Sequence, residues 1–452
     1  MQKIRIFSLL ILLLIILRGE NNLALNNPAI RYEGVWYPII DSSRVIFNRH
    51  TDRVLEHTES GISSTSRPYA YTQTGVRIKF KTASPYFCME FEQRQEGGHL
   101  GLENGFAIYA DSVRIAVKEK LKFTIDAPDS NRSILYTVLL PSLYAIDFTG
   151  LSIANGYKLE ELAPDSKPVY AAIGNSITHG TGHQSASFLT YPYILADSMN
   201  WKLYNLAVTG ARTGWPISLL FKDKNVDYIT IALGFNDWMW DNKPLSDKFY
   251  QYKKLLDSLV YFQPEAKIFC ITPLTTTKTE TQLDAPFSLQ DYRTMLIRHV
   301  SRRRNLGNQN IFILHGDSLS DASMLMDGIH LSKTGSPLFA DRLVEEINKL
   351  LQSNNTSINS ENPVELNFEL KQNYPNPFNP STNIQFYTKN TAEIELNILN
   401  LMGQKITTLF EGKVTRGFHR FNFKSHDLPN GIYLYRIESK DYNETKKMTI
   451  LK

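Results

Sequence analysis

The sequence of 452 residues contains only two cysteines, Cys88 and Cys270, which lie in different predicted domains. Two isolated cysteines provide neither a disulfide framework nor a cysteine zinc site. The sequence also lacks a phosphate-binding loop, a dinucleotide-binding fingerprint and any cluster of residues with metal-ligand spacing. We therefore expect a protein that needs no metal and no cofactor.

An excess of charge of one sign is also missing. The chain has 49 Lys and Arg residues against 45 Asp and Glu, which gives a formal net charge of +4. The one basic run, Arg302–Arg304, is interpreted as the solvated face of a helix. The composition therefore gives no reason to expect a nucleic-acid partner.

No clearly membrane-spanning run is present. The apolar run from Ile6 to Leu17 has about twelve residues, whereas a helix that crosses a bilayer needs about 20. Lys3 and Arg5 precede this run, and that order is typical of a secretory signal peptide. We predict a signal peptide over residues 1–25 and no stable membrane span. A retained membrane anchor is the alternative.

The part that follows the predicted signal, residues 30–163, is rich in short strand-like segments. Examples are "GVRIKFKT" and "YFCMEFEQ", in which apolar and polar residues alternate, with turn residues between the segments. Alternation of this kind is typical of strands with one buried face. We predict an all-β sandwich with a jelly-roll-like arrangement.

Residues 168–352 have a different pattern. The apolar runs "VYAAIG", "LYNLAV", "YITIALG", "KIFCITPL" and "NIFILHG" alternate with segments of helical length. Continuous apolar runs are typical of strands buried on both faces, and alternating β and α units predict a parallel sheet. We expect an α/β domain with a flavodoxin-like, doubly wound sheet of five strands, whose ligands bind at the carboxyl ends of the strands.

The remaining residues divide into a linker and a second all-β domain. Residues 353–368 are polar and almost free of large apolar side chains, which predicts a linker. Residues 369–452 begin with Pro and Asn and continue as alternating strands, which predicts a small all-β sandwich.

Four short motifs with polar residues or glycine follow predicted strands of the α/β domain. Ser176 comes directly after the first strand, where a sharp strand-to-helix turn would expose its hydroxyl as a nucleophile. Gly210 and Asn236 follow the second and third strands, and their N–H groups would suit an oxyanion. Asp327 and His330 precede the last helix, where the imidazole would serve as a general base that the carboxylate orients. Each signal alone is compatible with an ordinary turn, but together they predict one site.

The order Gly-Asn-Ser, Gly, Gly-x-Asn-Asp and Asp-x-x-His resembles the four motif blocks of the SGNH, or GDSL-type, hydrolases. The resemblance covers residues 168–352. It implies that Ser176 is the nucleophile of a triad with His330 and Asp327. It also implies an oxyanion hole formed by the N–H groups of Ser176 and Gly210 and the side-chain amide of Asn236. The family usually has Asp before the serine, whereas this chain has Asn175.

A β-sandwich before such a domain is similar to the layout of carbohydrate esterase family two, which implies removal of acetyl groups from polysaccharides. The expected substrate is therefore an acylated, most simply acetylated, polysaccharide or oligosaccharide. A lipid or short-chain acyl esterase and a non-catalytic glycan-binding protein are the alternatives. His179, Trp215, Trp238 and Trp240 are candidate substrate contacts, with a turn histidine and core tryptophans as the alternatives.

The C-terminal segments "YPNPFNPST", "ILNLMGQKI", "LPNGIYLYRI" and "TKKMTILK" resemble the sorting domain of the type IX secretion system. The resemblance implies passage through the periplasm and export to the cell surface or the medium. The type IX machinery would then be a partner of this domain. A carbohydrate-binding module is the alternative.

Overall fold

The computed structural model describes most of the chain, and two predicted segments fall largely outside it. The described residues are 19–240, 245–279, 287–355, 368–370, 372–373, 375–388, 390–415, 417–425, 428–439 and 442–451. The predicted signal-peptide core and most of the predicted linker lie outside these residues. The chain divides into two compact units, Met1–Ser357 and Ile358–Lys452.

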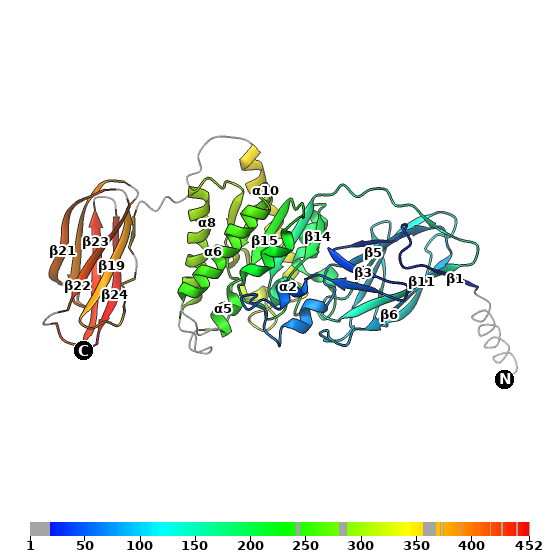
Figure 1. Cartoon of the computed structure of the whole chain (residues 1–452), viewed down its shortest axis with the longest axis horizontal. Coiled ribbons are helices and arrows are strands. Elements are labelled where there is room, and N and C mark those ends of the chain that lie inside the picture. The colour runs from blue at the N-terminus through cyan, green and yellow to red at the C-terminus, as the bar shows by residue number, and fades with distance from the viewer. Residues whose placement is uncertain are drawn as a thin grey trace. The chain divides into compact units, whose positions relative to one another are not determined.

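The N-terminal part of the first unit is an all-β sandwich, as predicted (Figure 1). Its two sheets are antiparallel and have six strands each. The first has the order β3 (Tyr37–Ile40), β4 (Val45–Asn48), β11 (Ile146–Ala154), β6 (Tyr86–Gln93) and β9 (Lys122–Asp126), with β1 (Glu20–Leu23) beside β11. The second has the order β12 (Leu159–Glu160), β5 (Arg77–Thr82), β10 (Ile134–Leu139), β7 (Phe106–Ala110) and β8 (Val113–Lys118), with β2 (Arg31–Glu33) beside β5.

The sandwich core follows from the alternation in its strands. In β5, Ile78 and Phe80 are buried and their neighbours are half-exposed, because successive side chains of a strand point to opposite faces. The Phe80 ring packs edge-on against Phe87 of the other sheet, with 5.0 Å between ring centroids. The two sheets therefore share one apolar core.

The α/β part confirms the predicted five-stranded parallel sheet. Its order is β14 (Lys202–Asn205), β13 (Val169–Gly174), β15 (Tyr228–Ala232), β16 (Lys267–Ile271) and β17 (Ile311–Leu314). In chain order this is 2-1-3-4-5, the flavodoxin-like arrangement. Because the order reverses beside β13, the carboxyl end of β13 is the place where a ligand is expected to bind.

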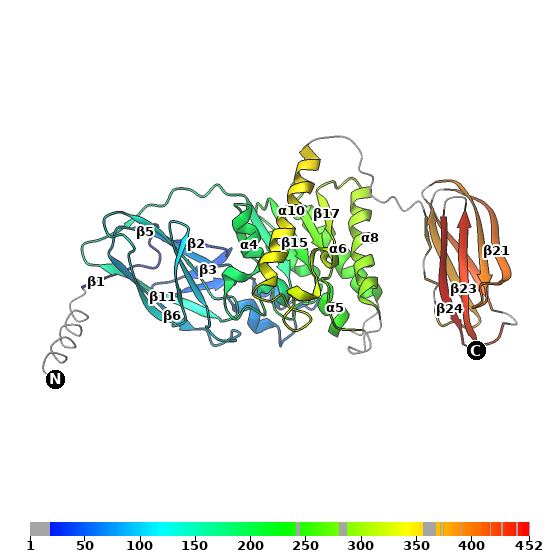
Figure 2. The same ribbon diagram turned by 180° about the vertical axis from the view of Figure 1, so that it is seen from behind.

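Helices cover both faces of the parallel sheet. The helices α6 (Leu245–Phe262) and α8 (Leu289–Asn305) cover the face seen in Figure 1. The opposite face is covered by α4 (Tyr191–Ser198) and α10 (Gly335–Asn355), as Figure 2 shows. The shorter helices are α2 (Asp52–Leu55), η1 (Arg67–Tyr71), α3 (Ser176–His179), η2 (Ser187–Leu189), η3 (Trp215–Phe221), α5 (Phe235–Trp240), α9 (Gly316–Leu319) and η4 (Ala322–Met324).

A long connection between β4 and β5 joins the sandwich to the α/β part. Helix α2 of this connection lies beside the α/β sheet in Figure 1 and packs near η3. The Trp36 ring stacks on Tyr204 of β14, with 4.8 Å between centroids. The Tyr37 hydroxyl donates a hydrogen bond of 3.2 Å to the Leu220 carbonyl. The two parts therefore form one packed body.

The second unit is a small all-β sandwich, as predicted. One antiparallel sheet has the order β18 (Phe368–Leu370), β19 (Ser381–Thr388) and β22 (Gly417–Lys424). The other has the order β21 (Lys405–Val414), β20 (Ala392–Leu399), β23 (Gly431–Ser439) and β24 (Tyr442–Ile450). Its core contains Phe386, Leu396 and Tyr435.

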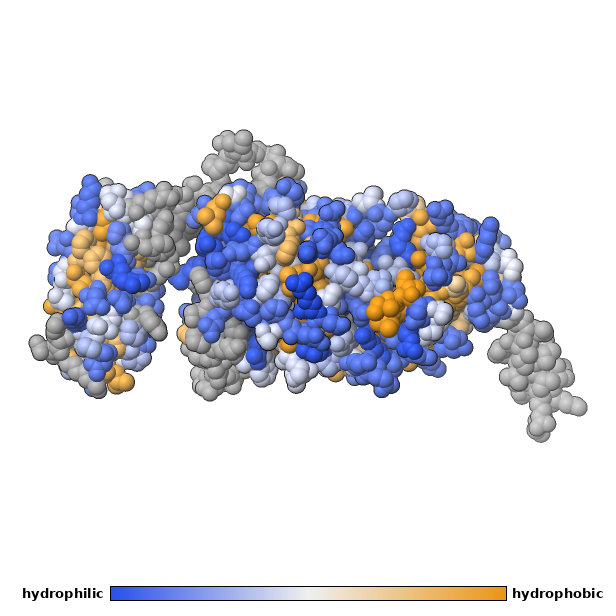
Figure 3. Space-filling model, in the orientation of Figure 1, coloured by the Kyte–Doolittle hydropathy of each residue, from blue (hydrophilic) through white to orange (hydrophobic). Residues whose placement is uncertain are grey.

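The described surface is mixed in polarity. The face shown in Figure 3 is largely hydrophilic, with small apolar patches. On the N-terminal sandwich the exposed apolar side chains include Ile39, Ile40 and Val113. Over the residues that the structure describes, no helix combines the length and hydrophobicity needed to cross a membrane.

Candidate active site

Ser176 is the first residue of α3 and directly follows the sharp turn at Asn175 that ends β13. Asn175 is the N-cap of α3, and its side-chain oxygen accepts a 3.1 Å hydrogen bond from the Ile177 N–H. A Cβ atom on Gly174 would lie 2.0 Å from Thr178 Oγ1, so only glycine lets α3 fold back so closely over the strand. The turn leaves Ser176 7% exposed. Asn175 thus provides the capping oxygen that the usual Asp would also provide.

Two hydrogen bonds connect Ser176, His330 and Asp327. The distance from Ser176 Oγ to His330 Nε2 is 2.9 Å. The distance from His330 Nδ1 to Asp327 Oδ2 is 2.7 Å. The other Asp327 oxygen accepts hydrogen bonds from the backbone N–H groups of Ile329 and His330, at 2.9 and 2.8 Å. The structure therefore brings these three predicted residues together in the order that the sequence predicts.

The charge state of Asp327 determines which imidazole nitrogen of His330 carries the proton. Partial burial alone would raise the pKa of Asp327. Hydrogen bonds from the His330 side chain, and from backbone N–H groups, hold that pKa below its usual value. An ionised Asp327 accepts the proton of Nδ1, which leaves the lone pair of Nε2 directed at the Ser176 hydroxyl. This arrangement suits transfer of the serine proton to His330.

Gly210 lies in the loop after β14 and has a left-handed backbone with φ of +80°. A Cβ atom there would lie 2.4 Å from the Oγ of Ser66, a residue of the N-terminal sandwich region. Asn236, in α5, donates a 2.9 Å hydrogen bond from Nδ2 to the carbonyl of Ala211, the residue after Gly210. Asn236 is therefore next to the Gly210 loop.

Three N–H groups near this loop remain available for a ligand. Within the described residues, the backbone N–H groups of Ser176 and Gly210 donate no hydrogen bond to the protein. The Nδ2 of Asn236 uses one of its two hydrogens on Ala211. Donors of this kind stabilise an oxyanion when they converge on it.

The prediction that His179 contacts substrate is wrong, because its side chain is completely buried. Its Nδ1 accepts a 3.0 Å hydrogen bond from the Thr209 N–H. Its Nε2 lies 2.8 Å from both Thr72 Oγ1 and the Ser142 carbonyl. Burial, and then the nearby charge of Arg49, hold the pKa of His179 far below its ordinary value. The ring is therefore a neutral structural link.

The three candidate tryptophans have different environments. Trp238 is buried and donates from Nε1 to the Phe287 carbonyl at 3.1 Å, so the prediction that it binds substrate is wrong. Trp215 donates to Glu59 at 2.6 Å, and Lys254 Nζ lies 3.9 Å from the centre of its ring. Trp240 is 63% exposed. Substrate contact by Trp240 stays a prediction.

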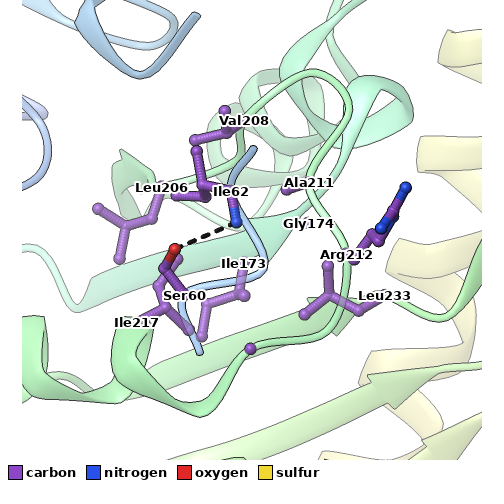
Figure 4. A pocket seen from close by; sticks show the side chains of 11 residues that line it. Ser60, Ile62, Ile173, Gly174, Leu206, Val208, Ala211, Arg212, Ile217 and Leu233 are labelled. Atoms are coloured by element: carbon purple, nitrogen blue, oxygen red, sulfur yellow. Dashed lines mark hydrogen bonds between the residues drawn. The ribbon is translucent and has the colours of Figure 1, made fainter. Parts of the chain in front are cut away.

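Residues of the N-terminal sandwich were missed by the sequence analysis. Arg49 and His50 bind carbonyls of the segment that leads to Gly210. Ile62 packs on Val208 and Ala211. Figure 4 shows Ser60, Ile62 and the loop residues Leu206, Val208 and Ala211 around a small apolar cavity, with the 3.3 Å hydrogen bond from the Ile62 N–H to Ser60 Oγ. These contacts join residues some 150 positions apart, and no local pattern indicates them.

Comparison with protein families agrees with this geometry. Residues 172–337 match the GDSL-like lipase/acylhydrolase family, and residues 372–451 match the secretion system C-terminal sorting domain. The class of protein is therefore an ester hydrolase with a GDSL-like domain and a C-terminal sorting domain. No curated protein sequence matches the chain significantly.

Three solved structures give the comparison more detail. The salicylyl-acyltransferase SsfX3 from a tetracycline biosynthetic pathway has 18% identity and a TM-score of 0.63, over 74% of this chain and 98% of that one. A family two carbohydrate esterase from Cellvibrio japonicus has 13% identity and a TM-score of 0.51, over 74% and 98%. An active site mutant of a family two carbohydrate esterase from Clostridium thermocellum has 18% identity and a TM-score of 0.51, over 62% and 93%. At these identities the similarity is one of fold.

Proposed function

We propose that the protein is a secreted serine esterase in which Ser176 is the nucleophile, His330 the general base and Asp327 the residue that orients the imidazole. The observation that carries the proposal is the continuous pair of hydrogen bonds, 2.9 Å from Ser176 to His330 and 2.7 Å from His330 to Asp327. Such a pair matches the order of contacts in a Ser-His-Asp triad.

The first half of the reaction forms an acyl-enzyme. Ser176 Oγ attacks the ester carbonyl carbon while its proton moves to His330 Nε2. The resulting oxyanion accepts hydrogen bonds from the N–H groups of Ser176 and Gly210 and from the second Nδ2 hydrogen of Asn236. His330 then gives its proton to the leaving alcohol oxygen as the carbon–oxygen bond breaks. The ionised Asp327 stabilises the imidazolium that forms in between.

The second half releases the acid. A water molecule attacks the acyl carbon while His330 Nε2 takes its proton, and a second tetrahedral oxyanion forms in the same hole. Collapse of this intermediate returns the proton to Ser176 Oγ and releases the carboxylic acid. No other group has to change its charge, which agrees with an Asp327 carboxyl whose pKa is lowered.

For the substrate we propose O-acetyl groups on a polysaccharide. The sorting domain supports delivery to polymers outside the cell. The fold of the first unit is shared with family two carbohydrate esterases. The exposed ring of Trp240 follows Asn236 on the same short helix and offers a face for a sugar ring.

The test is acetate release from acetylated xylan, acetylated glucomannan and a series of p-nitrophenyl esters. We expect the wild type to release acetate and Ser176→Ala to lose turnover by a factor on the order of 10⁶. Ser318→Ala, which changes an exposed serine on α9, is the matched control and keeps full activity. Equal release by Ser176→Ala and the wild type would end the esterase proposal. Cleavage of long-chain esters alone would end the polysaccharide proposal and favour a lipid esterase.

A further inference from the structure

A buried arginine of the N-terminal sandwich contacts the segment that leads to Gly210. Arg49 follows strand β4 directly and is 0% exposed. Its Nη1 donates to the carbonyls of Asn205 and Ala207, at 2.7 and 2.8 Å. Its Nε and Nη2 donate to the carbonyls of Thr72 and Tyr69, at 2.6 and 2.9 Å. One guanidinium group therefore joins the sandwich to the loop of the candidate oxyanion hole.

The hydrogen-bond acceptors of Arg49 are all neutral oxygens. Burial lowers the pKa of Arg49 to about 9, which reflects the cost of holding a cation away from water. A buried charge without a carboxylate among its hydrogen-bond partners is energetically unfavourable. An apolar side chain of similar size would fill the same space with a smaller loss of solvation free energy. The position of Arg49 therefore indicates a role besides packing.

The next residue, His50, binds the same segment. His50 Nε2 donates to the carbonyl of Leu206 at 3.0 Å. Three consecutive carbonyls, of residues 205 to 207, are thus bound by two consecutive sandwich residues. Successive carbonyls of an extended chain point in opposite directions, so Arg49 and His50 hold the segment from both sides. These side-chain contacts to the carbonyls agree with the end of strand β14 at Asn205, although the apolar run "LYNLAV" continues to Val208.

A second contact fixes the same loop to the nucleophile. His179 ends helix α3, which Ser176 begins, and accepts a hydrogen bond from the N–H of Thr209. Thr72 connects both contacts, because its carbonyl accepts from Arg49 Nε and its hydroxyl lies 2.8 Å from His179 Nε2. Thr209 is therefore held against α3 while residues 205–207 are held against the sandwich. Gly210 is the next residue in the chain.

We propose that Arg49 is a positioning residue for the oxyanion hole, which fixes residues 205–207 so that the Gly210 N–H faces the developing oxyanion beside Ser176. The proposal rests on the esterase function proposed above. It gives the N-terminal sandwich an indirect part in catalysis, because Arg49 would fix the geometry of the peptide that carries the Gly210 N–H without contacting the substrate. Loss of Arg49 would then affect the transition state more than the binding of the ester.

The test uses the full chain with Arg49→Met and Arg49→Lys, and p-nitrophenyl acetate as substrate. For Arg49→Met we expect kcat to fall about 100-fold with little change in KM, as when one oxyanion donor is lost. Arg49→Lys keeps the buried charge and part of the hydrogen bonding, and it should recover about tenfold of that loss. Tyr37→Phe is the matched control, because it removes a hydrogen bond between the same two parts without touching residues 205–210.

Thermal unfolding of each variant separates positioning from folding. A folded Arg49→Met protein with wild-type kcat would overturn the proposal. The proposal would also be overturned if kcat of Arg49→Met only followed the folded fraction, or if Tyr37→Phe lowered kcat as much as Arg49→Met. If Arg49→Met does not fold, a folded Arg49→Lys protein with wild-type kcat overturns the proposal, and a lowered kcat at unchanged KM supports it. If the wild type shows no Ser176-dependent hydrolysis, the proposed function fails together with this inference. If only Ser176→Ala loses activity, this inference alone fails.

Discussion

The molecule contains two all-β sandwiches that relate to their surroundings in opposite ways. The N-terminal sandwich directs Arg49, His50 and Thr72 at the α/β part, where each is buried and bonded to backbone or side-chain groups. In the described residues of the C-terminal sandwich, buried polar groups form hydrogen bonds within that unit. For example, Asn373 donates to Thr382 Oγ1 at 2.9 Å and to the Tyr435 hydroxyl at 2.8 Å.

The difference shows that architecture alone does not assign a role to a domain. Both regions are antiparallel sandwiches with an apolar core. The first places the polar side chains of Arg49 and His50 against the segment that leads to Gly210. The second forms a separate compact unit and matches a sorting domain. We therefore expect the esterase to depend on the first sandwich and to be indifferent to the second.

Deleting each sandwich in turn should give the largest difference in esterase activity between the two regions. Removal of residues 30–163 exposes Val208 and Ala211 and removes the partners of the carbonyls of residues 205–207, so we expect esterase activity to fall by more than about 100-fold. Removal of residues 358–452 should leave kcat and KM unchanged. The measurement is p-nitrophenyl acetate hydrolysis per folded molecule. Equal effects of the two deletions would contradict the account.

Two asparagine substitutions sharpen the comparison at the level of single residues. Asn236→Ala should lower turnover about 100-fold with the fold intact, because one oxyanion donor is lost. Asn397→Ala is the matched change in the C-terminal sandwich, where the amide is equally buried, and it should leave turnover unchanged. Wild-type turnover in Asn236→Ala would remove that residue from the mechanism.

Mild acid should affect the two units unequally. Burial lowers the pKa of His50 to about 3 and of His183 to about 4, and that of His179 lies far below its ordinary value. The unfolded chain takes up protons at these histidines below about pH 6.5 while the folded first unit does not. The contribution of these neutral, buried histidines to the stability of the first unit is therefore fully present above about pH 6.5. The free energy of unfolding falls by up to about 1.4 kcal/mol per pH unit for each histidine as the pH drops toward the pKa values of the folded state.

Calorimetry at about pH 7.5 and about pH 5 checks this expectation. The described residues of the C-terminal sandwich include no buried histidine, so its transition should move little over this range. His183→Asn should flatten the pH dependence of the first unit, because one titrating group is removed. Parallel shifts of both transitions would count against the assignment.

The smallest effect concerns the C-terminal sandwich alone. The Tyr435 hydroxyl accepts the hydrogen bond from the Asn373 N–H inside this unit. Tyr435→Phe leaves that donor unpaired and should cost about 1 kcal/mol of unfolding free energy. Esterase activity should stay at the wild-type level. Denaturant titration of the second unit measures the loss, and a parallel loss of activity would show that the two units are coupled.

The sequence predicted most of what is local or periodic. Continuous apolar runs predicted the five parallel strands, and parallel strands bring their carboxyl ends to one edge, which is why Ser176 and His330 could be expected to meet. Asp327 and His330 are three residues apart within one turn, so their contact is also local. Asn236 could be expected beside Gly210 for the same reason, because both follow the carboxyl ends of parallel strands.

What the sequence did not predict depends on contacts without a local pattern. Nothing in the segment around Arg49 indicates that it binds carbonyls 156 and 158 residues further along the chain. The tryptophans show a second limit. Trp238 and Trp240 are two residues apart in α5, and such residues lie on different faces of a helix. One is therefore buried and the other exposed, although both appeared equally suited to bind a sugar.

The most direct test of the central claim is to locate the nucleophile. The full chain is treated with an alkyl phosphonofluoridate, which reacts irreversibly with activated serines, and the labelled peptide is identified by mass spectrometry while residual esterase activity is followed. We predict one phosphonyl group on Ser176, with labelling and loss of activity in parallel, and no labelling of Ser176→Ala. Loss of activity with the label on another residue would contradict the account, and so would full activity after stoichiometric labelling of Ser176.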